Sequence, residues 1–341
     1  MADVDAILAL ANPDWNDPND KRCIAACLVN VVYQLEKGKE KEEMANECCK
    51  LLEFKVYEKI METRGGQEVI FGAVFQWVGK SRRGKDEGKP PSEVVAFRGT
   101  IPKGKDFLHN WKAANACHKS ISRGDIGLQY LQRCIKRHGP HNIWIVGHSL
   151  GAAIATVAAR KMGKEERNKM EAHLFNPPFL SPRLPELTFF EMVGRNLAAV
   201  RDIWRSLGFG APNALDFMMI DDEKLCALYN DFIGVSGWNP NIYVGKNDPV
   251  SCSYIRYFEV MGAMYKDKSK PLHERMKYLF SFEVAQETTP VHLLPSANLF
   301  VKDSGIFHPL ENHCLRQWWS RNINLKVKAY VAPVNAPRTQ T

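Results

Sequence analysis

The chain of 341 residues is 45% hydrophobic, so it can bury a sizeable core, and its length fits one large α/β domain with insertions or two ordinary domains. No apolar run approaches the roughly 20 residues that cross a bilayer, and the first residues lack the basic start and long apolar segment of a secretory signal. We therefore expect a cytoplasmic protein.

The formal net charge is +8, but the densest basic runs, residues 80–89 and 160–169, also contain acids and lack a nucleic-acid-binding motif. We expect no nucleic-acid partner, while peripheral contact with an anionic membrane surface stays open.

The first part of the chain has helical patterning. Apolar residues recur three and four apart through residues 21–61, and the Arg-Gly-Gly sequence at 64–66 ends this pattern. The pattern predicts a helical segment over residues 1–63. Two runs rich in Val, Ile and Phe, residues 68–78 and 92–100, then predict strands.

Beyond residue 100 the predicted elements alternate between helix and strand. They are a helix at 127–136, a strand at 142–146, a helix at 150–161, a strand at 172–179, a helix at 186–207 and a strand at 241–250. Strand, helix and strand at this spacing predict an α/β fold with a mainly parallel sheet covered on both faces.

The segment between residues 178 and 240 is too long for a connection in an α/β unit, so we interpret it as a helical insertion. One face of its predicted helix is apolar and could pack as core or cover a pocket as a lid. That face carries Phe190, Val193, Leu197, Val200, Trp204 and Leu207.

The sequence Gly-His-Ser-Leu-Gly at 147–151 lies between a predicted strand and a predicted helix of small residues. A sharp strand-to-helix turn needs glycines at both flanks to hold a strained serine without side-chain clash. This context predicts that Ser149 is a nucleophile.

A serine hydroxyl needs a histidine to take its proton and a carboxylate to hold that histidine, and on this kind of turn the order along the chain is serine, acid, histidine. Asp248 is the first candidate for the acid, because in "NIYVGKNDPV" it stands just past a strand whose end would lie near Ser149. Among the later histidines, His273 and His292 lie in a predicted helix and a predicted strand. His308 and His313 share one loop, and spacing alone does not separate them.

The remaining requirement is an oxyanion hole, in which preorganised N–H groups meet the charge that develops on a carbonyl oxygen. The amide after the nucleophile, that of Leu150, is one expected donor. The other is expected from the loop after an early central strand, and "VVAFRGT" makes the Thr100 amide our choice.

Several motifs together resemble the class 3 (fungal-type) lipases of the α/β-hydrolase fold, and more closely their plant lipase-like branch, whose members often carry the label "GDSL esterase/lipase". These motifs are "VVAFRGT", "VGHSLGAAIA", "HLFNPPFLSP", "PNIYVGKNDPVSCSYIRYFE", "PVHLLPSANL" and "ENHCLRQWW". The resemblance implies Ser149 as nucleophile, Asp248 as acid, His313 as base and Thr100 as an oxyanion donor.

The sequence thus predicts one α/β-hydrolase domain over residues 1–341 that cleaves a carboxylic ester, from a lipid or another small molecule, through an acyl-enzyme on Ser149. We expect no cofactor and no metal, and the nine cysteines, which form no paired CxxC units, indicate reduced structural thiols. Two alternatives stay open. The chain could be a lipase-like ligand-binding or signalling protein, or it could use the same pocket for acyl transfer or non-hydrolytic chemistry on a specialised metabolite.

Overall fold

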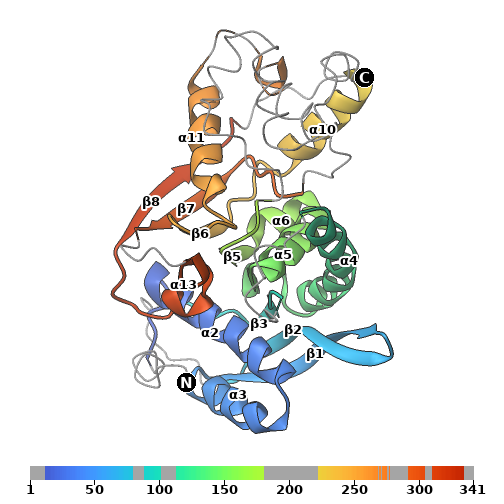
Figure 1. Ribbon diagram of the computed structural model, residues 1–341, viewed down its shortest axis with the longest axis vertical. Helices are drawn as coiled ribbons and strands as arrows, with labels where there is room; N and C mark the ends of the chain where they lie inside the picture. The colour runs from blue at the N-terminus through green and yellow to red at the C-terminus, as the bar shows by residue number, and fades with distance from the viewer. Residues whose placement is uncertain are drawn as a thin grey trace.

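The structure is a computed structural model that describes residues 12–79, 88–100, 113–179, 222–267, 269, 271–274, 276, 291–303 and 309–333. The described strands form an eight-stranded sheet in which their spatial order follows the chain (Figure 1). They are β1 (Phe54–Arg64), β2 (Gln67–Trp77), β3 (Glu93–Phe97), β4 (Ile143–His148), β5 (Glu171–Phe175), β6 (Asn241–Gly245), β7 (Ala297–Lys302) and β8 (Leu325–Tyr330).

The five strands from β3 to β7 are parallel, and β1, β2 and β8 pair antiparallel at the two edges. The described helices are α2 (Pro18–Glu36), α3 (Lys39–Leu51), α4 (Ala113–His138), α5 (Leu150–Lys161), α6 (Lys164–Lys169), α10 (Asp222–Gly234), α11 (Ser253–Lys266) and α13 (Pro309–His313), with short 3-10 turns η1 (Pro140–Asn142) and η2 (Leu315–Trp318). This architecture confirms the predicted α/β class with a mainly parallel sheet.

Each central strand contributes side chains to two hydrophobic clusters, one on each face of the sheet. On β4, Ile145 lies in the cluster that also contains side chains of α4, α5, α10 and α11, whereas Trp144 and Val146 lie in the cluster with α2, α3 and η2. Figure 1 shows the blue helices α2 and α3 on the opposite side of β3 from the green helices α4 and α5. The near-continuous apolar runs of the central strands follow from this, because a parallel strand covered on both faces has no solvent-facing side.

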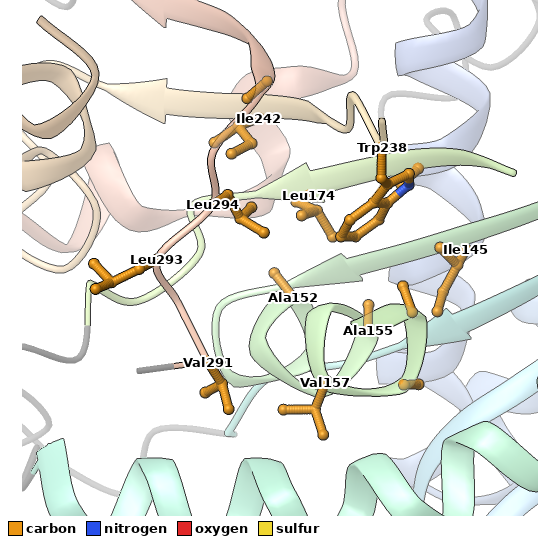
Figure 2. Close-up of a cluster of buried hydrophobic side chains, with 14 of the residues drawn as sticks. Ile145, Ala152, Ala155, Val157, Leu174, Trp238, Ile242, Val291, Leu293 and Leu294 are labelled. Atoms are coloured by element: carbon orange, nitrogen blue, oxygen red, sulfur yellow. The ribbon is translucent and has the colours of Figure 1, made fainter. Parts of the chain in front are cut away.

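Small side chains let α5 lie close to the sheet. Ala152 and Ala155 are completely buried, and Figure 2 shows them beneath the strands that carry Ile145 and Leu174, with the Trp238 ring alongside. A larger residue at either alanine would force the helix away from the strands. The close packing sets the position of the turn at which β4 passes into α5.

The prediction of helix over residues 54–61 is wrong, since α3 ends at Leu51 and β1 begins at Phe54. The Arg-Gly-Gly sequence is the turn of a β-hairpin, with Arg64 paired to Gln67 and positive φ values of 52° and 79° at Gly65 and Gly66. Two consecutive positive φ values give the turn that matches the twist of paired strands. The pairing with β2 outweighs the helical spacing of a few apolar residues.

The insertion helix predicted over residues 186–207 lies outside the described residues, so its role as core or lid stays a prediction, as does the single-domain reading of residues 1–341. Among the residues that the structure describes, no helix is long and apolar enough to cross a membrane.

Gly66→Ala should lower the free energy of unfolding by about 1–2 kcal/mol, the cost of a left-handed backbone with a Cβ. Apart from the neighbours of Gly66 in the chain, no atom of the described residues lies within 4 Å of the position of the added methyl group, so the loss would come from the backbone alone. Gly234→Ala is the matched control, because its methyl also meets open space but its φ is not positive. Urea unfolding should show no loss for the control, and an equal loss in both variants would contradict this reading of the hairpin turn.

Candidate active site

Ser149 occupies a strained turn between β4 and α5. Its φ of 55° and ψ of −127° are unusual for a residue with a side chain, and it is 2% exposed. Its N–H donates to the carbonyl of Phe175 at the end of β5 (2.9 Å), and its own carbonyl accepts from Ala152 (2.9 Å). Strain of this kind persists only where the surroundings over-determine it, and here a neighbouring strand and the first turn of α5 do so.

The two flanking glycines are required by close backbone contacts. A Cβ on Gly147 would overlap the backbone of Gly151, and a Cβ on Gly151 would overlap the backbone of Phe97 and Arg98. The glycines on both sides of Ser149 are therefore needed to avoid steric clashes, as the sequence predicted.

His313 lies at the end of α13, and its two ring nitrogens contact two different side chains. Its Nε2 is 2.9 Å from Ser149 Oγ, and its Nδ1 is 3.0 and 3.1 Å from the two carboxylate oxygens of Asp248. A carboxylate can only accept, so Nδ1 carries the proton, and the unprotonated Nε2 accepts from the serine hydroxyl. The structure brings together the three side chains that the sequence singled out.

Asp248 is a completely buried carboxylate that accepts several hydrogen bonds. Besides His313, the Val250 N–H donates to Oδ1 (3.0 Å), and the Asn176 amide donates to Oδ2 (2.7 Å), as does the Ser251 hydroxyl. Burial alone would raise the pKa of this carboxyl, but the His313 ring and these donors outweigh it, so the pKa lies below its usual value. Asp248 is therefore ionised at neutral pH.

Asn176 joins the loops that hold the acid and the base. It follows β5 with a φ of 44°, is completely buried, and its amide nitrogen lies 2.7 Å from Asp248 Oδ2 and 3.2 Å from the Asn312 carbonyl. Its oxygen accepts from the Trp318 indole (2.6 Å). One side chain thus ties the end of β5 to the loops on either side of β7.

All of these groups follow the carboxyl ends of parallel strands. Ser149 follows β4, Asn176 follows β5, Asp248 follows β6, and His313 lies in the connection between β7 and β8. Parallel strands deliver their carboxyl ends to one edge of a sheet, which is where ligand sites form in open α/β folds.

The two predicted oxyanion donors also lie at this edge. Leu150 is the first residue of α5, so its amide has no partner within the helix. Thr100 is exposed and follows Gly99, where a Cβ would stand 2.7 Å from Ser149 Cβ. The segment after β3 therefore passes directly beside the serine.

Two other candidate histidines pack against aromatic rings in the structure, and the third lies outside the described residues. His292 lies in a turn ahead of β7 rather than in a strand, because β7 begins only at Ala297, and its ring packs against Phe179. His273 packs against Tyr229. His308 lies outside the described residues.

Residues 94–204 match the model of a family described as Lipase (class 3). This part of the chain is similar to class 3 lipases. A protein named GDSL esterase/lipase from Arabidopsis thaliana is 25% identical, and the similarity covers 95% of each chain. The expected resemblance is confirmed, as is the α/β-hydrolase fold of the family.

At the level of enzyme class, the similarity to class 3 lipases supports a lipase- or esterase-like hydrolase of carboxylic esters. The family match includes Ser149 but ends before Asp248 and His313. The roles of individual side chains therefore rest on the geometry and are proposals.

Sequence reasoning missed three side chains near Ser149 and Asp248: those of Asn176, Ser251 and Tyr33, whose hydroxyl accepts from the Gly99 N–H (2.8 Å). Asn176 had a usable signal in the two prolines that follow it, because Asn-Pro marks a turn, and sites in parallel sheets form where the strands end. Ser251 stands three residues after the acid, and Tyr33 stands within the apolar pattern of α2. Neither has a pattern that distinguishes it from an ordinary turn or core residue.

Asn176→Ala should lower the free energy of unfolding by about 1–3 kcal/mol, because it leaves the buried Trp318 indole without its acceptor and removes a donor from Asp248. Asn176→Asp should cost more, since it places a second carboxylate against Asp248. Urea unfolding at pH 7 checks both. Equal stability of the aspartate variant and the native protein would show that the site does not depend on this amide.

Two buried histidines should make the protein sensitive to mild acid. Burial lowers the pKa of His148 and of His292 to about 3, whereas an unfolded histidine titrates near 6.5. The stability that these neutral rings contribute is complete above about pH 6.5 and is lost as pH falls toward 3, because only the unfolded state binds the protons. Between pH 6.5 and 5 we expect a loss on the order of 1 kcal/mol per pH unit for each ring.

Urea unfolding between pH 7 and 5 measures this slope. His292→Gln should reduce it, while His141→Gln, at an exposed position, should leave it unchanged. The same slope in His292→Gln as in the native protein would show that His292 does not titrate in this way.

Proposed function

We propose that the protein hydrolyses a carboxylic ester, from a lipid or another small molecule, through an acyl-enzyme on Ser149. The observation that carries the proposal is the continuous hydrogen-bonded chain from Ser149 Oγ through His313 to Asp248, with distances of 2.9 and 3.0 Å. A hydroxyl becomes a competent nucleophile when a base of this kind is already in contact with it.

In the first step Ser149 Oγ attacks the ester carbonyl carbon while its proton passes to His313 Nε2. The charge that forms on the imidazole faces the buried, ionised carboxylate of Asp248. The negative charge that forms on the substrate oxygen is met by the amides of Leu150 and Thr100. The carbon–oxygen bond to the alcohol then breaks, and the alcohol leaves with the proton from Nε2.

In the second step a water molecule attacks the acyl-enzyme. Its proton passes to His313 Nε2, and the bond from the acyl carbon to Ser149 Oγ breaks, which returns the proton to the serine and releases the carboxylic acid. The positive end of α5 begins at Leu150 and favours negative charge beside it in both steps.

A fluorophosphonate probe and a series of esters of increasing chain length test this proposal. Ser149→Ala should abolish labelling and lower ester turnover on the order of 10⁴- to 10⁶-fold. Ser320→Ala, at an exposed serine, is the matched control and should behave as the native protein. Equal labelling of Ser149→Ala and the native protein would exclude the serine mechanism.

The identity of the base is tested in the same assay. His313→Ala should reduce turnover about as much as Ser149→Ala, and the double variant should lose no more, because the residues act as one unit. His308→Ala should cost far less, as should His141→Ala at an exposed position. The reverse ranking of His308 and His313, in variants with native circular dichroism, would reassign the base to His308.

A further inference from the structure

The segment that carries Thr100 is held by hydrogen bonds on both sides of Gly99. The Gly99 N–H donates to the Tyr33 hydroxyl of α2 (2.8 Å), and the Gly99 carbonyl accepts from Arg98 Nη1 (2.8 Å). The N–H belongs to the peptide group that joins Arg98 to Gly99, and the carbonyl belongs to the one that joins Gly99 to Thr100. Both peptide planes are therefore fixed, including the plane that contains the Thr100 N–H.

The Arg98 side chain is itself held by two further contacts. Its Nε donates to the Ile70 carbonyl (2.7 Å), and its Nη2 lies 3.1 Å from the Glu36 carboxylate, which in turn accepts from the Ile70 N–H (2.7 Å). The arginine is 4% exposed. Burial lowers the pKa of its guanidinium and the charge of Glu36 offsets that effect, so the buried cation keeps its proton.

This arrangement determines where the Thr100 amide points. In a trans peptide group the C=O and the N–H project to opposite sides. Because the carbonyl of Gly99 is turned toward Arg98, the N–H of Thr100 is turned away from it. A charged donor on the carbonyl also polarises the peptide group, which makes its N–H a stronger donor.

Tyr33 connects the same segment to the base. Its oxygen accepts from Gly99, so its own proton goes to Nδ1 of His148 (2.9 Å), and Nε2 of that ring donates to the His313 carbonyl (2.8 Å). The direction is forced, because the carbonyl can only accept and a neutral imidazole has one N–H. A single hydrogen-bonded chain thus runs from the Thr100 segment to the backbone of His313.

Glycine at position 99 lets these groups meet. A Cβ there would stand 2.7 Å from both Tyr33 Oη and Ser149 Cβ, and 2.9 Å from the His148 carbonyl. The tyrosine hydroxyl and the serine therefore approach the same face of the Gly99 backbone, which leaves no room for a side chain.

We propose that Tyr33 and Arg98 are positioning residues that aim the Thr100 amide at the oxyanion before the reaction begins. The assignment rests on the serine hydrolase function proposed above and deepens it. The Leu150 amide is held by α5, but the Thr100 amide belongs to an irregular segment and would otherwise have to be oriented as charge develops. A donor that is already aimed costs no reorganisation in the transition state.

The test compares an oxygen ester with its thionoester, in which sulfur replaces the carbonyl oxygen. Sulfur is larger and a weaker hydrogen-bond acceptor, so a well-aimed amide favours the oxygen ester over the thionoester. Tyr33→Phe removes one oxygen atom and keeps the ring. It should lower kcat for the oxygen ester about 10- to 100-fold with little change in KM, and it should lower the preference for oxygen over sulfur by a similar factor.

Arg98→Lys should move the preference in the same direction, because lysine keeps the charge but not the fork that reaches three partners. Tyr57→Phe, at an exposed tyrosine, is the matched control and should leave both esters unaffected. Rates are normalised to the sites titrated by fluorophosphonate, so that a loss of folded protein does not count as a loss of kcat.

Equal loss on both esters in Tyr33→Phe, or no loss on either, would overturn the assignment and leave the serine mechanism standing. Native protein that is not labelled at Ser149 would overturn the serine mechanism, and the assignment with it. A selective loss of kcat for the oxygen ester in Tyr33→Phe and in Arg98→Lys would establish Tyr33 and Arg98 as positioning residues.

Discussion

A buried carboxylate constrains the whole edge of the sheet at which the site lies. Moving an ion of this kind out of water costs on the order of several kcal/mol unless donors surround it, and Asp248 has no exposed surface. Its donors come from the turn after β6, from the end of β5 and from the end of α13. Three separate segments therefore have to converge for the acid to remain charged, and the position of His313 follows from that convergence.

The strained turn at Ser149 depends on a second set of close contacts. Gly147 and Gly151 let the first turn of α5 lie against the end of β3, and the alanines of α5 let the rest of the helix follow the sheet. Because Gly99 lies beside Ser149 Cβ, the same contacts bring the end of β3 into the site. The close packing of α5 on the sheet therefore also places the Thr100 segment beside Ser149.

Helix α2 has a part in both arrangements although it is distant in sequence from the serine. Its buried Arg22 donates to the carbonyl of Trp318 (3.3 Å), whose indole holds Asn176, while Tyr33 and Glu36 hold Gly99 and Arg98 near the end of the helix. The face of the sheet that carries α2 thus supports Asn176 and Asp248 at one end of the helix and the Thr100 segment at the other. The apolar residues of α2 are those that cover the sheet. Its polar residues Arg22, Tyr33 and Glu36 hold the segments around the site in place.

Local pattern was sufficient for the elements whose features lie close together in the chain. The β4 turn and α5 followed from glycine spacing and small residues, and the parallel sheet followed from the alternation of strands and helices. Ser149 and Asp248 could be chosen because each stands just after a strand with an unmistakable apolar run. Residues 54–61 were mistaken for helix, because the decisive partner of β1 is another strand and the spacing of a few apolar residues does not report pairing.

The sequence by itself determined the fold class and singled out Ser149 and Asp248 as candidate site residues, because steric and periodic requirements act between residues that are near neighbours in the chain. Tertiary structure decided that His313 contacts both Asp248 and Ser149, because these contacts join positions 65 and 164 residues apart and spacing within the loop did not separate His313 from His308. It also decided the contacts of Asn176, Tyr33 and Arg98. Their hydrogen bonds join segments from 28 to 142 residues apart, and a contact at that separation leaves no periodic trace in the sequence.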